Sequence, residues 1–143
     1  HAGGTALNAG TLTITSSASV GTGTLSGAGG TLLNVGAGPG LSPFTLANAV
    51  ALSGLMTVDL RGSSASIDAA GTYSTNGNDL VLNGAITGAG GLALQGGGRL
   101  FLNGANAHAG GTSIDNSAIF VGSNTALGTG PLAVGNGALG ATG

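Results

Sequence analysis

The chain has 143 residues, of which 32 are glycine and only 4% are charged, and its net charge at neutral pH is -2. Average proteins contain about 7% glycine and about 25% charged residues. With no lysine and only the two arginines Arg61 and Arg99, the chain lacks the basic patch that nucleic-acid binding requires. It has no cysteine, which excludes disulfides, thiolate chemistry and cysteine–zinc sites. The frequent glycines also disfavour long helices.

Apolar residues alternate with small or polar residues in short runs along the chain. The first clear run is TLTI at residues 11–14, and later runs are FTL at 44–46, TVDL at 57–60 and LAL at 92–94. A period of two places alternate side chains on opposite faces, which is typical of β-strands. The glycine-rich and Asn-Gly stretches between the runs are typical of turns.

The runs recur at a spacing of about twenty residues. LVLNGA at residues 80–85 returns as LFLNGA at 100–105, and IFV at 119–121 continues the series. A longer echo also exists, because the opening HAGGT returns at 108–112, and each copy is followed by Gly-Thr-Gly-x-Leu. Three leucines share the shorter spacing, namely Leu12, Leu32 and Leu52.

Short strands with a fixed repeat predict an all-β fold, a right-handed parallel β-helix (β-solenoid) of about seven coils with about twenty residues each. Successive coils stack about 4.8 Å apart, with Leu, Ile and Val pointing inward and small residues pointing outward. We expect a single β-helix segment over residues 1–143. Within it, repeat copies are expected at approximately 1–34 and 84–143, with a less regular stretch at 35–83.

Residues 91–112, GLALQGGGRLFLNGANAHAGGT, resemble the passenger-associated transport repeat of bacterial autotransporters. That repeat typically reads GLxKxGxGxLxLSGxNxYxGGT, and the likeness continues through ALGTGPL at 126–132. Residues 82–92 are similar to the stretch that usually precedes the repeat, and residues 1–34 resemble the second half of an earlier copy. The sequence departs from the pattern where Lys, a small residue and an aromatic residue are usual, at Leu94, Arg99 and His108.

The resemblance implies an autotransporter passenger, which passes the outer membrane with a C-terminal translocator β-barrel and folds outside the cell. It therefore implies an extracellular or cell-surface location. Because the chain begins in mid-repeat, we expect it to be a segment of a larger passenger. The expected partners are other passenger rods and host or matrix surface molecules. End-to-end self-association is also expected, since the ends of a stack expose strand edges and apolar core.

The charged residues offer few candidates for chemistry. Asp59 and Arg61 lie two apart on one predicted strand, where an ion pair at the surface is the expected role. Asp79 follows Asn76, Gly77 and Asn78, but the spaced acidic ligands of a calcium loop are missing, so a plain turn is favoured. We therefore expect no metal site and no cofactor.

Catalytic and phosphate-binding motifs are equally weak. His108, Asp115 and several serines include the residue types of a triad, but no Gly-x-Ser-x-Gly elbow or fixed spacing supports one. The GGG run at 96–98 does not lead from a strand into a helix, which argues against a phosphate-binding loop. We therefore predict no catalytic residue in this chain.

Two sets of polar residues suggest structural roles. Thr11, Thr13 and Thr15 form an outward row of the kind found on ice-binding solenoids, but the row does not recur at coil spacing. Asn83 and Asn103 occupy the same position of successive repeats, so their amides are expected to bond along the axis of the stack.

Three functions follow as hypotheses. The first is a structural segment of a surface-exposed passenger that supports adhesion or self-association, as in biofilm formation and virulence. The second is a passive stalk that displays a catalytic domain outside this chain. The third, an enzyme with a groove site on the helix, needs clustered charges, whereas the fixed charges are scattered along the sequence, so we expect no enzyme. Polar residues interrupt residues 44–58 too early for a membrane-spanning helix.

Overall fold

The computed structural model describes residues 2–14, 16–34, 44–60, 65–67, 73–75, 79–96 and 98–141. These residues form seventeen β-strands and no helix. Fifteen of the strands belong to three sheets with parallel pairing, which we number I, II and III. The all-β class expected from the sequence is therefore confirmed, and the parallel sheets are consistent with a β-solenoid.

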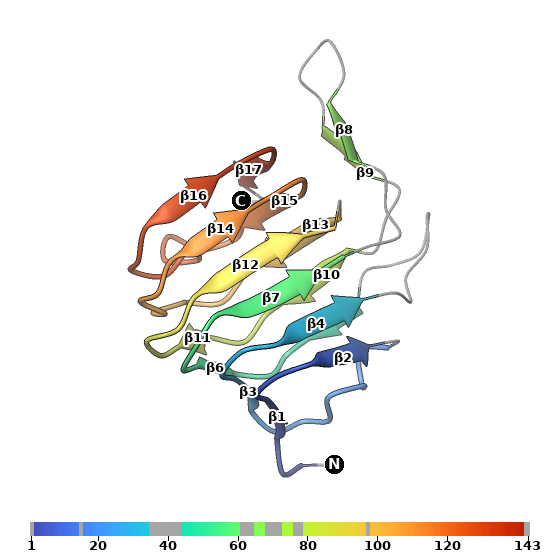
Figure 1. Cartoon of the computed structure of the whole chain (residues 1–143), viewed down its shortest axis with the longest axis vertical. Coiled ribbons are helices and arrows are strands. Elements are labelled where there is room, and N and C mark those ends of the chain that lie inside the picture. Colours follow the sequence, from blue (N-terminus) through green and yellow to red (C-terminus); the bar gives the residue numbers. More distant parts are fainter. Residues whose placement is uncertain are drawn as a thin grey trace.

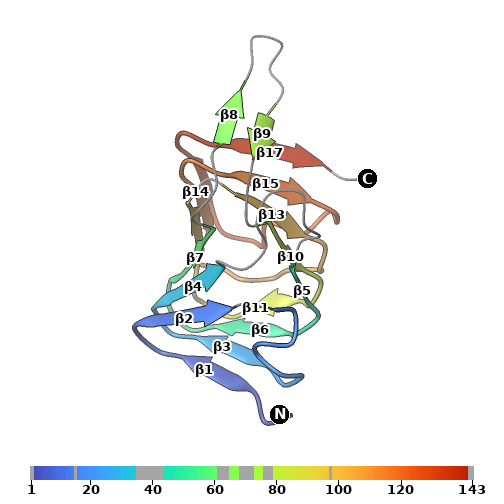
Figure 2. The ribbon, with the colours of Figure 1, turned by 90° about the vertical axis from the view of Figure 1, so that its right-hand side faces the viewer.

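The described strands pass through sheets I, II and III in that order three times (Figures 1 and 2). Before these passes the chain visits only sheets I and II, and after them it alternates between sheets II and III. Sheet I contains β1 (Thr5–Leu7), β3 (Leu25–Gly27), β6 (Val50–Leu52) and β11 (Ile86–Thr87). Sheet II contains β2 (Thr11–Ile14), β4 (Thr31–Asn34), β7 (Met56–Asp59), β12 (Leu92–Gln95), β14 (Thr112–Ile114) and β16 (Leu132–Val134). Sheet III contains β5 (Phe44–Leu46), β10 (Leu80–Leu82), β13 (Arg99–Leu102), β15 (Ala118–Val121) and β17 (Ala138–Ala141).

Paired strands place equivalent repeat positions side by side. Leu80 pairs with Leu100, twenty residues later, and Leu100 pairs with Ile119, as the sequence period predicts. The prediction that Leu12, Leu32 and Leu52 share one position in successive repeats is wrong for Leu52. Leu12 pairs with Leu32 in sheet II, but Leu52 lies in sheet I. The column breaks there because extra residues precede β5 and shift the register.

All the extra chain length enters at the corner between sheets II and III, which we call the II–III corner. Nine residues separate β4 from β5 and twenty separate β7 from β10, whereas three separate β12 from β13. The longer insertion carries an antiparallel hairpin of β8 (Ala65–Ile67) and β9 (Tyr73–Thr75), which projects away from the three sheets in both views (Figures 1 and 2). These insertions use length that regular coils would occupy. Sheet II accordingly has six described strands, and the expected count of about seven coils is not confirmed.

The other two corners are tight because backbone packs directly on backbone. A Cβ on Gly104 would overlap the carbonyl oxygen of Gly84, and a Cβ on Gly84 would overlap that of Asn48. Gly54 and Gly90 meet the same restriction at the corner between sheets I and II. These glycines are therefore required by close approach. The II–III corner has a similar contact between its last two coils, where a Cβ on Gly137 would overlap the carbonyl oxygen of Ser117, whereas both insertions lie in earlier coils.

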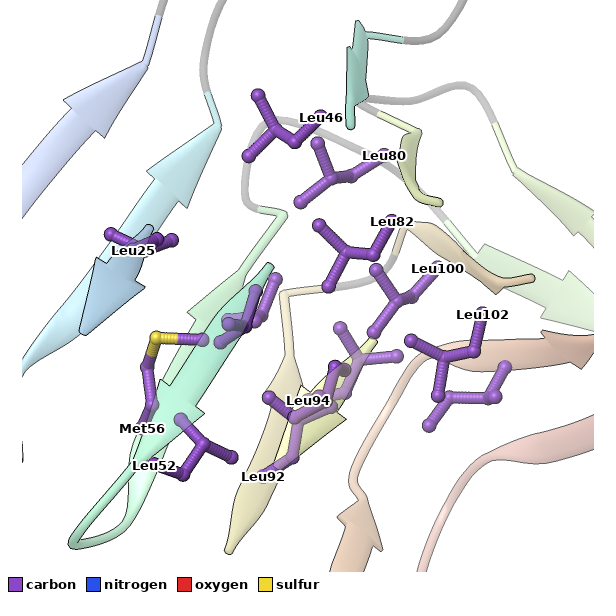
Figure 3. Packing of buried hydrophobic residues seen from close by; sticks show 14 of the residues in the cluster. Leu25, Leu46, Leu52, Met56, Leu80, Leu82, Leu92, Leu94, Leu100 and Leu102 are labelled. Atoms are coloured by element: carbon purple, nitrogen blue, oxygen red, sulfur yellow. The ribbon is translucent and has the colours of Figure 1, made fainter. Parts of the chain in front are cut away.

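Alternate residues of several described strands fill the space between the sheets and form the core. Leu80 and Leu82 of β10 stack on Leu100 and Leu102 of β13, and all four are at most 1% exposed (Figure 3). The inward leucines expected from the period of two are thus confirmed for these two strands. Burying such a side chain contributes about 1.5–3 kcal/mol relative to leaving it exposed.

Candidate functional site

The described charged side chains gather at the II–III corner, although they are scattered in sequence. Asp59 ends β7, Asp79 immediately precedes β10, Arg99 begins β13, and Asp115 immediately follows β14. This arrangement follows from the topology, because each of these positions lies where the chain passes from a strand of sheet II to a strand of sheet III. The expectation of scattered charge on the folded molecule is therefore wrong for these four residues.

Asp79 and Arg99 form the best-defined charged contact of this corner. The Asp79 carboxylate accepts bonds of 3.0 Å from both the backbone N–H and Nε of Arg99, and of 2.5 Å from Nη2. The Arg99 guanidinium also lies 5.7 Å from the ring centroid of Phe101, which stacks on Phe120 at 5.2 Å. Asp79 thus anchors the next coil, and the proposed turn at 76–78 lies outside the described residues.

Asp59 is buried, whereas the sequence suggested a position at the surface. It is only 2% exposed, and its carboxylate accepts a 3.2 Å hydrogen bond from Nε2 of Gln95 on the neighbouring strand β12. Its expected partner Arg61 lies outside the described residues. The Asp59 side chain is therefore part of the contact between two coils.

His108 and Asp115 are not brought together into a triad. His108 precedes β14 and is fully buried, whereas Asp115 follows β14 and is exposed. The imidazole Nε2 instead lies 2.8 Å from Oγ1 of Thr112, and Nδ1 has no hydrogen-bond partner. Burial lowers the pKa of His108 below its ordinary value of 6.5, because the charged form loses its hydration. The arrangement offers no activated nucleophile.

A buried asparagine is the functional residue that sequence reasoning missed. Asn106 is 3% exposed and bridges two neighbouring coils. Its Oδ1 accepts a 2.8 Å hydrogen bond from the N–H of Ile86, and its Nδ2 donates a 2.6 Å hydrogen bond to the carbonyl of Ala126. The signal was its fixed place in the repeat resembled by residues 91–112. The Asn106 side chain hydrogen-bonds to backbone groups at a place where sheet I has no further described strand.

The HAGGT copies build the same local contact on different sheets. Thr5 of β1 donates to the carbonyl of Val20, and Thr112 of β14 donates to the carbonyl of Leu127, both at 3.2 Å. The first copy lies in sheet I and the second in sheet II. The sequence echo therefore preserves a hydrogen bond between strand and turn, while its place around the stack changes by one sheet.

The surface offers a groove but no cluster of catalytic groups. A groove of about 480 Å³ lies beside the turn that follows β2, and Asn48, one of its polar side chains, already donates to the carbonyls of Gly21 and Gly23. No group of three or more His, Asp or Glu side chains in the described part of the chain is placed to hold a metal ion. The groove is lined by Ser17, Gly21, Thr22, Thr45, Ala47 and Asn48.

The remaining sequence candidates have structural places. Thr11 and Thr13 are exposed on β2, and Thr15 lies outside the described residues. The position of Thr11 is again threonine on the next two strands of sheet II, at Thr31 and Thr57, but Thr13 pairs with Leu33, so the row as a whole does not recur. The run at 96–98 connects β12 to β13, two strands, although residue 97 itself is not described. Neither set gathers groups that could bind a phosphate.

Comparisons with protein-family models, curated proteins and solved structures found no match to this chain. Within the described residues, no helix is long and apolar enough to cross a membrane.

Proposed function

We propose that the chain is a structural segment of a secreted or surface-exposed autotransporter passenger, and that it supports adhesion or self-association. In this proposal the three parallel sheets are the sides of a right-handed β-helix with about twenty residues per regular coil. The observation that carries it is the parallel register between equivalent repeat positions, as in the pair Leu80 and Leu100. Such a stack is the architecture that the resemblance to the transport repeat implies.

The side wall supports binding through many weak contacts. Successive strands of sheet II carry one row of small or short polar outward residues, in which Thr57 pairs with Ala93, Ala93 with Ser113, and Ser113 with Ala133. A wall with so little charge has a weak long-range field and little dependence on salt. The partners that fit it are other passenger rods and host or matrix surface molecules, bound without a single deep pocket.

The roles of the described polar groups favour a non-enzymatic chain. Asp79 holds Arg99, Asp59 accepts from Gln95, and Asn106 bridges two coils. Each of these groups joins one strand or turn to the next. The alternative function is a passive stalk that displays a catalytic domain, and in either case the full protein would carry a translocator β-barrel and stand at the cell surface.

The test is to display the chain on a Gram-negative bacterium through a translocator barrel and to measure clumping and attachment to host cells. We expect clumping or attachment above that of cells displaying the barrel alone. Asp115→Ala, at an exposed corner position, and His108→Gln at neutral pH should leave it nearly unchanged. Leu100→Ala should abolish it through loss of the fold, because removing that buried side chain costs about 2–5 kcal/mol.

Two results would count against the proposal. If the folded chain promotes no more clumping or attachment than the barrel alone, adhesion is wrong and the stalk is favoured. If His108→Gln abolishes attachment at neutral pH while the circular dichroism of the β-sheets is intact, the chain carries a localised site. Protease accessibility on intact cells reports whether each variant reaches the surface.

A further inference from the structure

His108 occupies a fully enclosed position between two coils. It lies in the segment that follows β13, where the N–H of Ala109 donates to the carbonyl of Gly88 on one side. On the other side the carbonyl of His108 accepts a 3.0 Å hydrogen bond from the N–H of Thr129. The imidazole is accommodated because a glycine, Gly128, stands twenty residues after it, and a Cβ there would lie 2.7 Å from Nδ1 of His108.

The hydrogen bonds determine which ring nitrogen carries the proton. Oγ1 of Thr112 donates its single proton to the carbonyl of Leu127 at 3.2 Å, so toward His108 it acts as acceptor. Nε2 of His108, at 2.8 Å from Oγ1, is therefore the N–H of a neutral imidazole. Nδ1 carries a lone pair, is buried and has no hydrogen-bond partner.

A proton added to Nδ1 would create a buried charged donor without an acceptor. The elements packed against the ring are the chain after β11, strand β14 and the turn at 123–128, and none of them contains a titratable or charged residue. His108 precedes β14, whereas the II–III corner lies at the opposite end of that strand. The described charged residues all lie at this corner and are therefore remote from His108: Asp59, Asp79, Arg99 and Asp115. A buried charge with no partner is strongly unfavourable.

We propose that His108 is an acid sensor within the stack, whose protonation loosens segment 103–111 and the turn at 123–128 from the remaining coils. The loosening is local, because the contacts at the ring are to neighbouring residues only: Thr112, which bonds to the ring, also donates to Leu127 of the turn, and Asn106 of the segment donates to Ala126 of the turn. The direction agrees with the pKa of His108, which desolvation lowers from 6.5. The stability that neutral His108 contributes to the folded chain is complete above pH 6.5, the unfolded-state pKa. It is lost as the pH falls through the folded-state pKa.

The experiment measures urea unfolding of the chain between pH 7.5 and pH 5.0, a window in which ordinary Asp side chains remain ionised. With an unfolded-state pKa of 6.5 for His108, the equilibrium constant for unfolding should rise by up to ~30-fold between pH 7.5 and pH 5.0. His108→Gln, which retains a donor toward Thr112, should lose this component. His1→Gln is the matched control and should keep it, since it removes the other histidine of the chain.

Two further readouts make the outcome decisive even if His108→Gln folds poorly. Imidazole nitrogen shifts of the folded wild-type chain should show the Nε2–H form and a midpoint below 6.5. Amide exchange, corrected for its intrinsic pH dependence, should accelerate on acidification at residues 106–111 and 126–129 but not in β3 and β6. Equal pH dependence in the wild type and His108→Gln, an ordinary imidazole midpoint, or uniform acceleration of exchange would each overturn the proposal.

Discussion

The side-chain amide of Asn103 donates a 2.9 Å hydrogen bond to Oδ1 of Asn83, so two asparagines from successive coils are joined along the axis of the stack. This bond is exposed to solvent. Three residues later, Asn106 makes a similar link inside the protein, where its amide satisfies the N–H of Ile86 and the carbonyl of Ala126. Asn103 and Asn106 thus both link successive coils through a side-chain amide, the first exposed to solvent and the second buried.

We predict very different costs for removing the two amides. Asn103→Ala should lower the free energy of unfolding by no more than about 1 kcal/mol, since water replaces an exposed hydrogen bond. Asn106→Ala should cost about 2–6 kcal/mol, because it leaves a buried N–H and a buried carbonyl without partners, each at about 1–3 kcal/mol. Urea titrations of both variants measure the difference. Equal effects would show that the internal bridge is replaced by water.

The period of the sequence predicted more of the fold than of its internal polar contacts. Twenty-residue spacing was sufficient to expect Leu100 beside Leu80 and Asn103 beside Asn83, because parallel stacking converts equal spacing into contact. It failed for Leu52, since the length of an insertion decides on which sheet a later residue lies. A single sequence does not reveal at which corner an insertion leaves the stack, because that depends on which corners are already closed by backbone contacts.

The gathering of charge at the II–III corner was missed because it depends on contacts between coils. Asp79 and Arg99 are twenty residues apart, a spacing that the repeat alone would have paired, but the turn at 76–78 suggested a local role for Asp79 instead. Asp59 appeared to belong to an exposed face, and its burial follows from the neighbouring coil and Gln95. Contacts between coils thus override the local pattern around each charged residue.

We predict that Asp79 stabilises the stack and that Asp115 does not. Asp79→Ala should lower the free energy of unfolding by about 1.5–3 kcal/mol, because it removes the charged acceptor for the Arg99 backbone and guanidinium. The Asp79 side chain is 10% exposed, so water replaces it poorly. Asp115→Ala is the matched control at the same corner and should change the value by less than about 0.5 kcal/mol. Comparable losses in both variants would contradict a specific role for the Asp79–Arg99 contact.

We predict that inserted chain is tolerated at the II–III corner and not at the corner between sheets III and I. A flexible Gly/Ser segment of eight residues after Asn116 should leave the β-sheet circular dichroism and the cooperative unfolding transition intact. The same segment after Gly104 should unfold the chain, because Gly104 lies against the backbone of Gly84. If the Gly104 insertion retains the cooperative transition, the backbone contacts at that corner do not limit the fold.

The last prediction concerns the exposed apolar side chains of β16 and β17. Leu132, Val134 and Leu139 are 40%, 46% and 45% exposed, although they pair with the buried residues Thr112, Ile114 and Ile119 one repeat earlier. An apolar surface next to unpaired strand edges favours pairing with another chain. We therefore expect concentration-dependent association of the isolated chain in analytical ultracentrifugation.

A matched pair of substitutions tests whether these positions cause the association. Val134→Lys should shift the chain toward monomer, since a charge at this site opposes both apolar contact and strand pairing. Ser53→Lys is the control, because Ser53 is exposed but lies in the turn between β6 and β7, in the middle of the stack. It should leave the association constant unchanged. A strictly monomeric wild-type chain at high concentration, or an equal effect of the two substitutions, would show that the inward row of β16 and β17 is not an interface.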